Sequence, residues 1–269
     1  MSGRDPQTLA NGLGAALVTV LAYVLVEILL SALFLDLQGP LGLDEIEAGE
    51  LARVLATGLV VSTLLHWRGL GHGRLLHDSP MPVLLTLLAT AAPLLALLPL
   101  LWTVNGWVDT LLQMVFPLSA WEAAWFERAA DGSPVSLLSA CLLAPVLEEM
   151  LFRGLILRGL LTRYPPSTAI VHSAALFGLA HFNIYQFFVA FSTGIVLGLA
   201  WQRTRSLWPC VLLHAGFNAG VMWMSSPDGK AFGDALAQPL WLPVGLALFA
   251  WGARLLLKLP VIPAQGSSD

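Results

Sequence analysis

Charged residues are scarce in this sequence, and cysteine is almost absent. Asp, Glu, Lys and Arg make up 11% of the 269 residues and hydrophobic residues 57%, whereas soluble domains carry about 25% charged residues. A soluble core does not account for this difference, so the composition excludes an ordinary soluble globular protein. The two cysteines, Cys141 and Cys210, both lie in apolar runs, and no disulfide framework is expected.

Segments of about ten residues with alternating hydrophobicity, the pattern of an outer-membrane barrel, are also lacking. The sequence has instead a series of apolar runs of about 20 residues, the length that a helix needs to cross ~30 Å of hydrocarbon. Because backbone polar groups in lipid must be satisfied within each segment, these runs predict helices. We therefore expect an all-α, polytopic transmembrane helix bundle of about eight spans. The expected spans are about 13–35, 51–66, 83–102, 135–160, 167–182, 184–202, 207–225 and 239–257.

The chain is expected to form one membrane domain with three regions. Residues 1–134 hold the first spans and acidic extracytoplasmic loops, 135–225 form the helical core that contains the polar motifs, and 226–269 hold the last span and a tail. The tail is expected to be disordered after Pro260. Segment 103–118 carries three polar side chains and is interpreted as interfacial rather than spanning.

Basic residues gather on alternate loops of this topology. With the N-terminus in the cytoplasm, nine of the 13 Lys and Arg residues lie on or near the cytoplasmic side: Arg4, Arg68, Arg74, Arg158, Arg163, Arg203, Arg205, Arg254 and Lys258. Arg53, Arg128 and Lys230 are exceptions among the acidic loops on the opposite side. Cytoplasmic loops of membrane proteins carry an excess of Lys and Arg. We therefore expect both termini in the cytoplasm, and the Ala- and Leu-rich composition favours a prokaryotic inner membrane.

Several charged side chains lie inside the expected spans, where each costs at least ~2.5–3.5 kcal/mol and therefore indicates a function. Glu149 and Arg153 are four residues apart and can pair on one helical face. Glu148 points about 100° away from Glu149 and has no local cation, so its presence needs another explanation. Glu27, in the first span, is interpreted as a single interhelical hydrogen-bonding residue.

Two further spans carry polar side chains at compatible depths. Glu148 lies about 17 residues before the turn expected near 164–166, and His181 about 15 after it, which places both roughly 22–26 Å from that turn. His214 and Asn218 are four residues apart and share one helical face. A carboxylate facing an imidazole can deprotonate water, and a second imidazole with an amide can donate to an oxyanion. These four residues predict a hydrolytic site in the bundle core.

Three motifs carry a family resemblance. Glu-Glu-x-x-x-Arg at 148–153, Phe-x-x-x-His at 177–181 and His-x-x-x-Asn at 214–218 resemble the motifs of the CAAX-processing and bacteriocin-processing (CPBP, or Abi) intramembrane proteases. The resemblance covers about residues 135–225. Each motif alone is weakly diagnostic, but three in this order and spacing are specific.

The resemblance implies an intramembrane endopeptidase and a role for each motif residue. Glu148 is implied as the base that activates water, assisted by His181. His214 and Asn218 are implied to bind the oxyanion. Glu149 and Arg153 are implied to support the site.

The metal content of such a site is open at this stage. Two imidazoles and a carboxylate can ligate Zn²⁺, and the candidate ligands are Glu148, His181 and His214. Against zinc, the helix lacks His-Glu-x-x-His spacing, and Asn218 is a poor zinc ligand but a good oxyanion donor. We favour a metal-free, glutamate-type mechanism without a cofactor, with a zinc metalloprotease as the alternative.

The expected substrate is a membrane-associated peptide or the C-terminal tail of a membrane protein. Membrane lipid is the other expected partner, nucleic acid is not expected, and no oligomeric state is indicated. Two rival functions are open for the same sequence. A proton- or ion-coupled transporter also needs buried Glu and His, but the inverted repeats common in transporters are lacking. The other rival is a non-enzymatic bacteriocin-immunity membrane protein.

Overall fold

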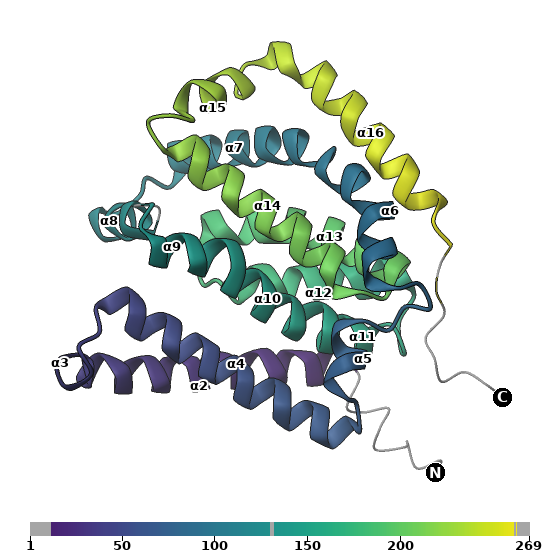
Figure 1. Cartoon of the computed structure of the whole chain (residues 1–269). Coiled ribbons are helices and arrows are strands. Elements are labelled where there is room, and N and C mark those ends of the chain that lie inside the picture. The colour runs from purple at the N-terminus through teal and green to yellow at the C-terminus, as the bar shows by residue number, and fades with distance from the viewer. Residues whose placement is uncertain (1–11, 130–131, 261, 263–269) are drawn as a thin grey trace.

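The computed structural model describes residues 12–129, 132–260 and 262, and these residues are almost entirely helical (Figure 1). Within the described residues, the one β interaction is an isolated bridge between His77 and Ser206. The prediction of an all-α helix bundle is therefore confirmed. The tail expected to be disordered after Pro260 lies, except for Ile262, outside the described residues.

Six helices in the described part of the chain are long and apolar enough to cross a membrane. They are α2 (Leu13–Asp36), α4 (Glu45–Arg68), the helix that comprises α9 to α11 (Pro134–Leu160), α13 (Ile184–Thr204), α14 (Leu207–Ser225), and η3 with α16 (Pro239–Lys258). Helices α6 (Val83–Leu95) and α7 (Leu98–Val115), which meet at a 47° bend, count as a seventh candidate span if the two together cross the membrane once. Helix α12 (Pro166–Leu179) has only 14 residues. The polytopic character is confirmed, with six or seven candidate spans where about eight were expected.

Two expected boundaries are wrong. The span expected at 83–102 bends between α6 and α7, where Pro93 and Pro99 each lack a backbone N–H for the helical ladder. Helix α7 then continues to Val115, through most of the segment interpreted as interfacial. Helix α4 begins at Glu45 rather than near 51, because Asp44 and Glu47 form a reciprocal capping box.

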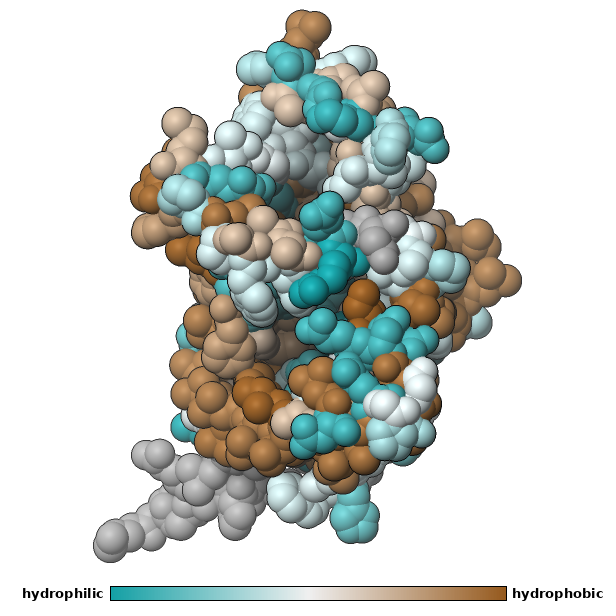
Figure 2. All heavy atoms as spheres, turned by 90° about the vertical axis from the view of Figure 1, so that its left-hand side faces the viewer, coloured by the Kyte–Doolittle hydropathy of each residue, from teal (hydrophilic) through white to brown (hydrophobic). Residues whose placement is uncertain are grey.

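Short helices connect the long ones at the two ends of the bundle. They are α3 (Gln38–Leu41), α5 (His72–Leu76), α8 (Ala120–Ala129) and α15 (Lys230–Leu236). Helices α3, α8 and α15 lie at the end seen on the left in Figure 1. Figure 2 faces that end and shows hydrophilic residues across it, with hydrophobic residues on the flanks. This distribution is typical of a bundle end at the membrane–water interface.

Helix α13 forms the centre of the bundle. Half of its most apolar window is buried, compared with 11% for α2. Glycines allow α12 to pack closely along it: a Cβ on Gly198 would lie 2.8 Å from Ile170 Cγ2, and one on Gly178 would lie 2.8 Å from the Phe187 carbonyl oxygen. Helix α14 packs on α13, α6 and α10, whereas α2 packs mainly on α4. The α2–α4 hairpin therefore flanks a core built from α10 to α14 (Figure 1).

Basic residues that were expected to share one side of the membrane do meet at one end of the bundle. Asp78, whose side chain is buried, accepts hydrogen bonds from Arg158 Nη1 at 2.8 Å and Arg74 Nε at 3.2 Å. Burial raises the pKa of the Asp78 carboxyl, but the hydrogen bonds and charges of Arg158 and Arg74 outweigh burial, so this pKa lies below its ordinary value. Asp78 thereby ties α5 and the following loop to the start of α11.

The Asp78 interaction is expected to stabilise the protein at neutral pH and to lose its effect in acid. A carboxyl whose folded pKa is lowered contributes stability above its unfolded pKa of about 3.9, and this contribution disappears as pH falls through the folded pKa. Thermal unfolding of detergent-purified wild type and Asp78→Asn should therefore differ equally from pH 7 down to about pH 4. The difference should shrink below that range. A difference already lost between pH 7 and pH 5 contradicts this prediction.

Candidate active site

A buried cluster of three charged or titratable side chains joins two helices. Arg153 Nη1 donates to Glu149 Oε1 at 2.8 Å, and Arg153 Nη2 donates to the Gly194 carbonyl oxygen at 3.2 Å. The side chains of Glu149 and Arg153 are completely buried. His214 Nδ1 lies 2.9 Å from the same Glu149 oxygen. The clamp anticipated within one helix is thus a three-residue network that also fixes an imidazole on α14.

Phe177 lies at the centre of this network. The Arg153 guanidinium stacks 4.4 Å above its ring, and its edge-to-face contacts with the His181 and His214 rings have centroid distances of 5.1 and 5.8 Å. A cation above an aromatic face is stabilised by the ring quadrupole. Phe177 is the first residue of the Phe-x-x-x-His motif, and its role is to hold two imidazoles and a guanidinium in place.

The helix that carries the two glutamates has irregular winding. Alpha-helical α10 (Ala144–Glu149) lies between two π-helical stretches, η1 (Ser139–Leu143) and η2 (Met150–Leu157). Pro145 cannot donate a backbone hydrogen bond, and π-turns often occur in helices at functional sites. At the end of α10, Glu149 turns into the protein, whereas the Glu148 side chain keeps 19% of its surface exposed.

Glu148 and His181 face one cavity but do not contact each other directly. Glu148 Oε2 lies 3.8 Å from His214 Nε2, and no hydrogen bond or ion pair between Glu148 and His181 is found among the described residues. His181 lies in the turn after α12 instead of inside a span, so the expected helix 167–182 ends earlier. Its Nδ1 donates to the Phe177 carbonyl oxygen at 2.9 Å, since a carbonyl can only accept. This bond leaves Nε2 of the neutral ring as an acceptor.

Asn218 lies one turn after His214 on α14. Its Nδ2 donates to the Ala140 carbonyl oxygen at 2.8 Å. An amide nitrogen carries two hydrogens, so one donor remains for a ligand. The bond to Ala140, in η1, fixes the amide relative to the glutamate-bearing helix.

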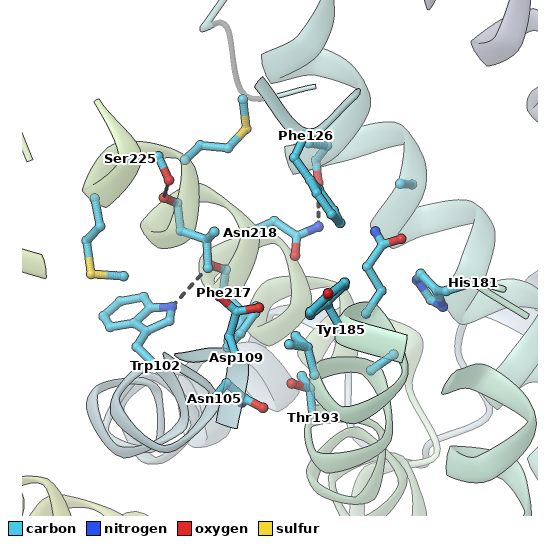
Figure 3. A pocket seen from close by; sticks show the side chains of 18 of the residues that line it. Trp102, Asn105, Asp109, Phe126, His181, Tyr185, Thr193, Phe217, Asn218 and Ser225 are labelled. Atoms are coloured by element: carbon cyan, nitrogen blue, oxygen red, sulfur yellow. Dashed lines mark hydrogen bonds between the residues drawn. The ribbon is translucent and has the colours of Figure 1, made fainter. Parts of the chain in front are cut away.

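All four of these side chains line a single cavity of about 920 Å³: Glu148, His181, His214 and Asn218. Aromatic residues form much of its wall, and Figure 3 shows Trp102, Phe126, Tyr185 and Phe217 around it. Trp102 Nε1 donates to the Phe217 carbonyl oxygen at 3.1 Å, which ties α7 to α14 (Figure 3). The lining also includes Glu45, at the start of α4, and Arg128, in α8, the helix at the left-hand end of the bundle in Figure 1. The cavity thus connects the buried polar residues with that end.

Arg53 also lines this cavity, and sequence reasoning missed it. It lies in α4, where it forms ion pairs with Glu27 and Glu50 and lines the cavity together with Glu148. Glu148 was expected to have no cation nearby on its own helix. This is the case, because Arg153, the basic residue of that motif, is paired with Glu149. The cation comes instead from a helix about 90 residues earlier. Its one signal in the sequence was that it is a basic exception among acidic residues.

The arrangement does not fit a metal centre. Within the described residues, no group of three or more His, Cys, Asp or Glu side chains lies close enough to hold a metal ion. Glu148 and His214 are near each other, but the third candidate ligand, His181, is not placed to complete the set. The absence of a metal requirement stays a prediction.

Comparisons with known proteins agree with the motif resemblance. Residues 130–220 match the family model of the type II CAAX prenyl endopeptidase Rce1-like proteins. The chain is 24% identical over 112 residues to a Bacillus subtilis protein named "Putative membrane peptidase YdiL"; the match covers 42% of this chain and 46% of that protein. No solved structure matches.

The resemblance to CAAX-processing membrane proteases is therefore confirmed for the segment that carries the motifs. The match includes Glu148, Glu149, Arg153, the Phe177–His181 motif and the His214–Asn218 motif. The family match does not reach α2 or α4. The match to the Bacillus subtilis protein spans about half the length of that protein.

Proposed function

We propose that the protein is an intramembrane endopeptidase in which Glu148 and His181 activate water while His214 and Asn218 hold the oxyanion. The observation that carries the proposal is that one cavity is lined by all four side chains and reaches a polar end of the bundle. The comparisons support the general class, a membrane protease.

The proposed reaction begins with water between the Glu148 carboxylate and His181. Glu148 accepts one proton, and the oxygen of the water forms a bond to the carbonyl carbon of the scissile peptide. The carbonyl oxygen becomes negative and accepts hydrogen bonds from Asn218 Nδ2 and His214 Nε2. The carbon–nitrogen bond then breaks, and the proton held by Glu148 passes to the leaving nitrogen.

His214 can act as an oxyanion donor only when Nε2 carries a proton. Its Nδ1 already donates to Glu149, whose oxygen is 2.9 Å away and can only accept when ionised. The donating form is therefore the imidazolium, with the Glu149 carboxylate as its counter-ion. Arg153 Nη1 donates to the same Glu149 oxygen at 2.8 Å and holds the carboxylate in place. This gives the buried cluster a role in the chemistry beyond holding two helices together.

The proposed substrate is a peptide, or the C-terminal tail of a protein, located near the membrane. An aromatic, partly polar cavity can take an extended segment that enters from the interface. We also propose that the protein resides in a prokaryotic inner membrane with both termini in the cytoplasm, as the distribution of basic residues suggests. Mechanistically, we propose a glutamate-type protease without a metal.

The test is cleavage of synthetic peptides, each comprising one apolar span and a polar C-terminal tail, by the detergent-purified protein. We expect the wild type to release tail fragments, detected by mass spectrometry, and the Glu148→Ala variant to release none. A zinc chelator should leave cleavage unchanged. If cleavage is lost on chelation and restored specifically by Zn²⁺, the metal-free mechanism is wrong. If no peptide is cleaved but Glu148→Gln abolishes a proton flux in proteoliposomes, the function is transport.

A further inference from the structure

Arg53 is a cation in a transmembrane helix that neither the motifs nor the family match explains. It lies in α4, outside the matched residues 130–220. Charged side chains within a membrane are costly and usually mark function. It was also an exception to the distribution of basic residues along the sequence.

Arg53 forms ion pairs with two glutamates, but these pairs do not occupy all of its N–H donors. Its Nη1 lies 3.0 Å from Glu50 Oε1 and its Nε lies 3.4 Å from Glu27 Oε1. A guanidinium has five N–H donors, so these bonds leave donors free. The Arg53 side chain retains 27% exposure and borders the cavity. A purely structural link between α2 and α4 does not require a guanidinium that faces the active-site cavity.

The charged and titratable groups around Glu148 come from its own helix and from three other helices. On its own helix, Glu149 and Arg153 neutralise each other. From α14, His214 Nε2 is 3.8 Å away, and from the end of α12, His181 lines the same cavity. Helix α4 packs on α10 and η2, and Arg53 and Glu148 line the same cavity. Among the described residues Arg53 forms its ion pairs with Glu27 and Glu50, so its charge acts on Glu148 across the cavity and not through a direct bond.

We propose that Arg53 is a positioning residue whose positive charge, on the cavity that both side chains line, attracts the Glu148 carboxylate toward the cavity, so that the α2–α4 hairpin completes the active site. This inference rests on the proposed endopeptidase function. Arg53 acts through Glu148 and does not contact substrate. Glu27 and Glu50 make its surroundings negative, which disfavours the alternative that Arg53 binds an anionic group of the substrate.

The kinetic test uses the membrane-tail peptide that the wild type cleaves. Arg53→Gln should lower kcat about tenfold or more while KM stays within about twofold, because a displaced base impairs the chemical step and not peptide binding. Arg53→Lys retains the charge and should recover most of kcat. Arg254→Gln, which removes an exposed arginine of α16, should leave both constants unchanged. A rise in KM alone, or equal losses in Arg53→Gln and Arg53→Lys, overturns the inference.

A second measurement does not depend on activity or on the proposed function. Thermal unfolding midpoints are compared for wild type, Arg53→Gln, Glu148→Gln and the double variant. If the two side chains attract each other, the double variant loses less than the sum of the single losses. If Arg53→Gln does not fold, a variant that combines Arg53→Gln with Glu50→Gln is used in its place, because this combination leaves the net charge of the protein unchanged. If the decreases in unfolding midpoint are additive, the inference is overturned even if the wild type cleaves peptides. If they are non-additive but no peptide is cleaved, only the proposed function is refuted.

Discussion

Replacing Glu148 with glutamine is expected to lower kcat/KM for the cleaved peptide by about 10²–10⁴-fold, the usual contribution of a general base. Glutamine has almost the same shape as glutamate but cannot accept the proton of the attacking water. Because the Glu148 side chain is partly exposed to the cavity rather than locked in the buried cluster, the fold should tolerate the change. Steady-state kinetics of the detergent-purified variant, with its thermal unfolding midpoint as a folding check, measure this effect.

The matched control is Asp234→Asn, which neutralises a carboxylate outside the cavity. Asp234 pairs with Lys230 on α15, and its side chain is 66% exposed. This variant should retain wild-type kinetics, since an exposed ion pair contributes little. Wild-type kcat/KM in Glu148→Gln would assign the role of base to another residue.

Replacing Arg153 with methionine is expected to reduce the free energy of unfolding by about 3–5 kcal/mol, the typical cost of removing one partner from a buried ion pair. Arg153 and Glu149 are both completely buried, so the remaining carboxylate has no water to stabilise it. The Gly194 carbonyl oxygen and the Phe177 ring also lose a contact. The measurement is thermal or denaturant unfolding in detergent, followed by circular dichroism.

A double replacement separates the structural role of this pair from its chemical role. Glu149→Leu with Arg153→Met removes both charges, and it should recover much of the stability lost in Arg153→Met alone. Activity should not return, because His214 Nδ1 loses its acceptor on Glu149. Full activity in the double variant would show that Glu149 is not needed to hold His214. Unchanged stability in Arg153→Met would show that the ion pair is not important to the fold.

Local patterns in the sequence were sufficient to predict the helices and to identify the motif residues. The length and polarity of the apolar runs determine that the chain forms membrane helices, because lipid leaves the backbone no other partner. The i,i+4 spacing of Glu149 and Arg153 is a local relation that a helix realises directly. The helix ends were less accurate: proline positions bend α6 against α7, and a capping box extends α4 to Glu45.

These local patterns could not predict which side chains on different helices lie next to each other. The sequence by itself determined a helical membrane protein and the motif residues that we propose carry its chemistry. Only the tertiary structure decided that Glu149 binds His214, that Phe177 lies between two imidazoles and a guanidinium, and that Arg53 lines the same cavity as Glu148. The reason is physical: spacing within a helix fixes which residues share a face, whereas the packing and rotation of each helix against its neighbours fix which faces meet.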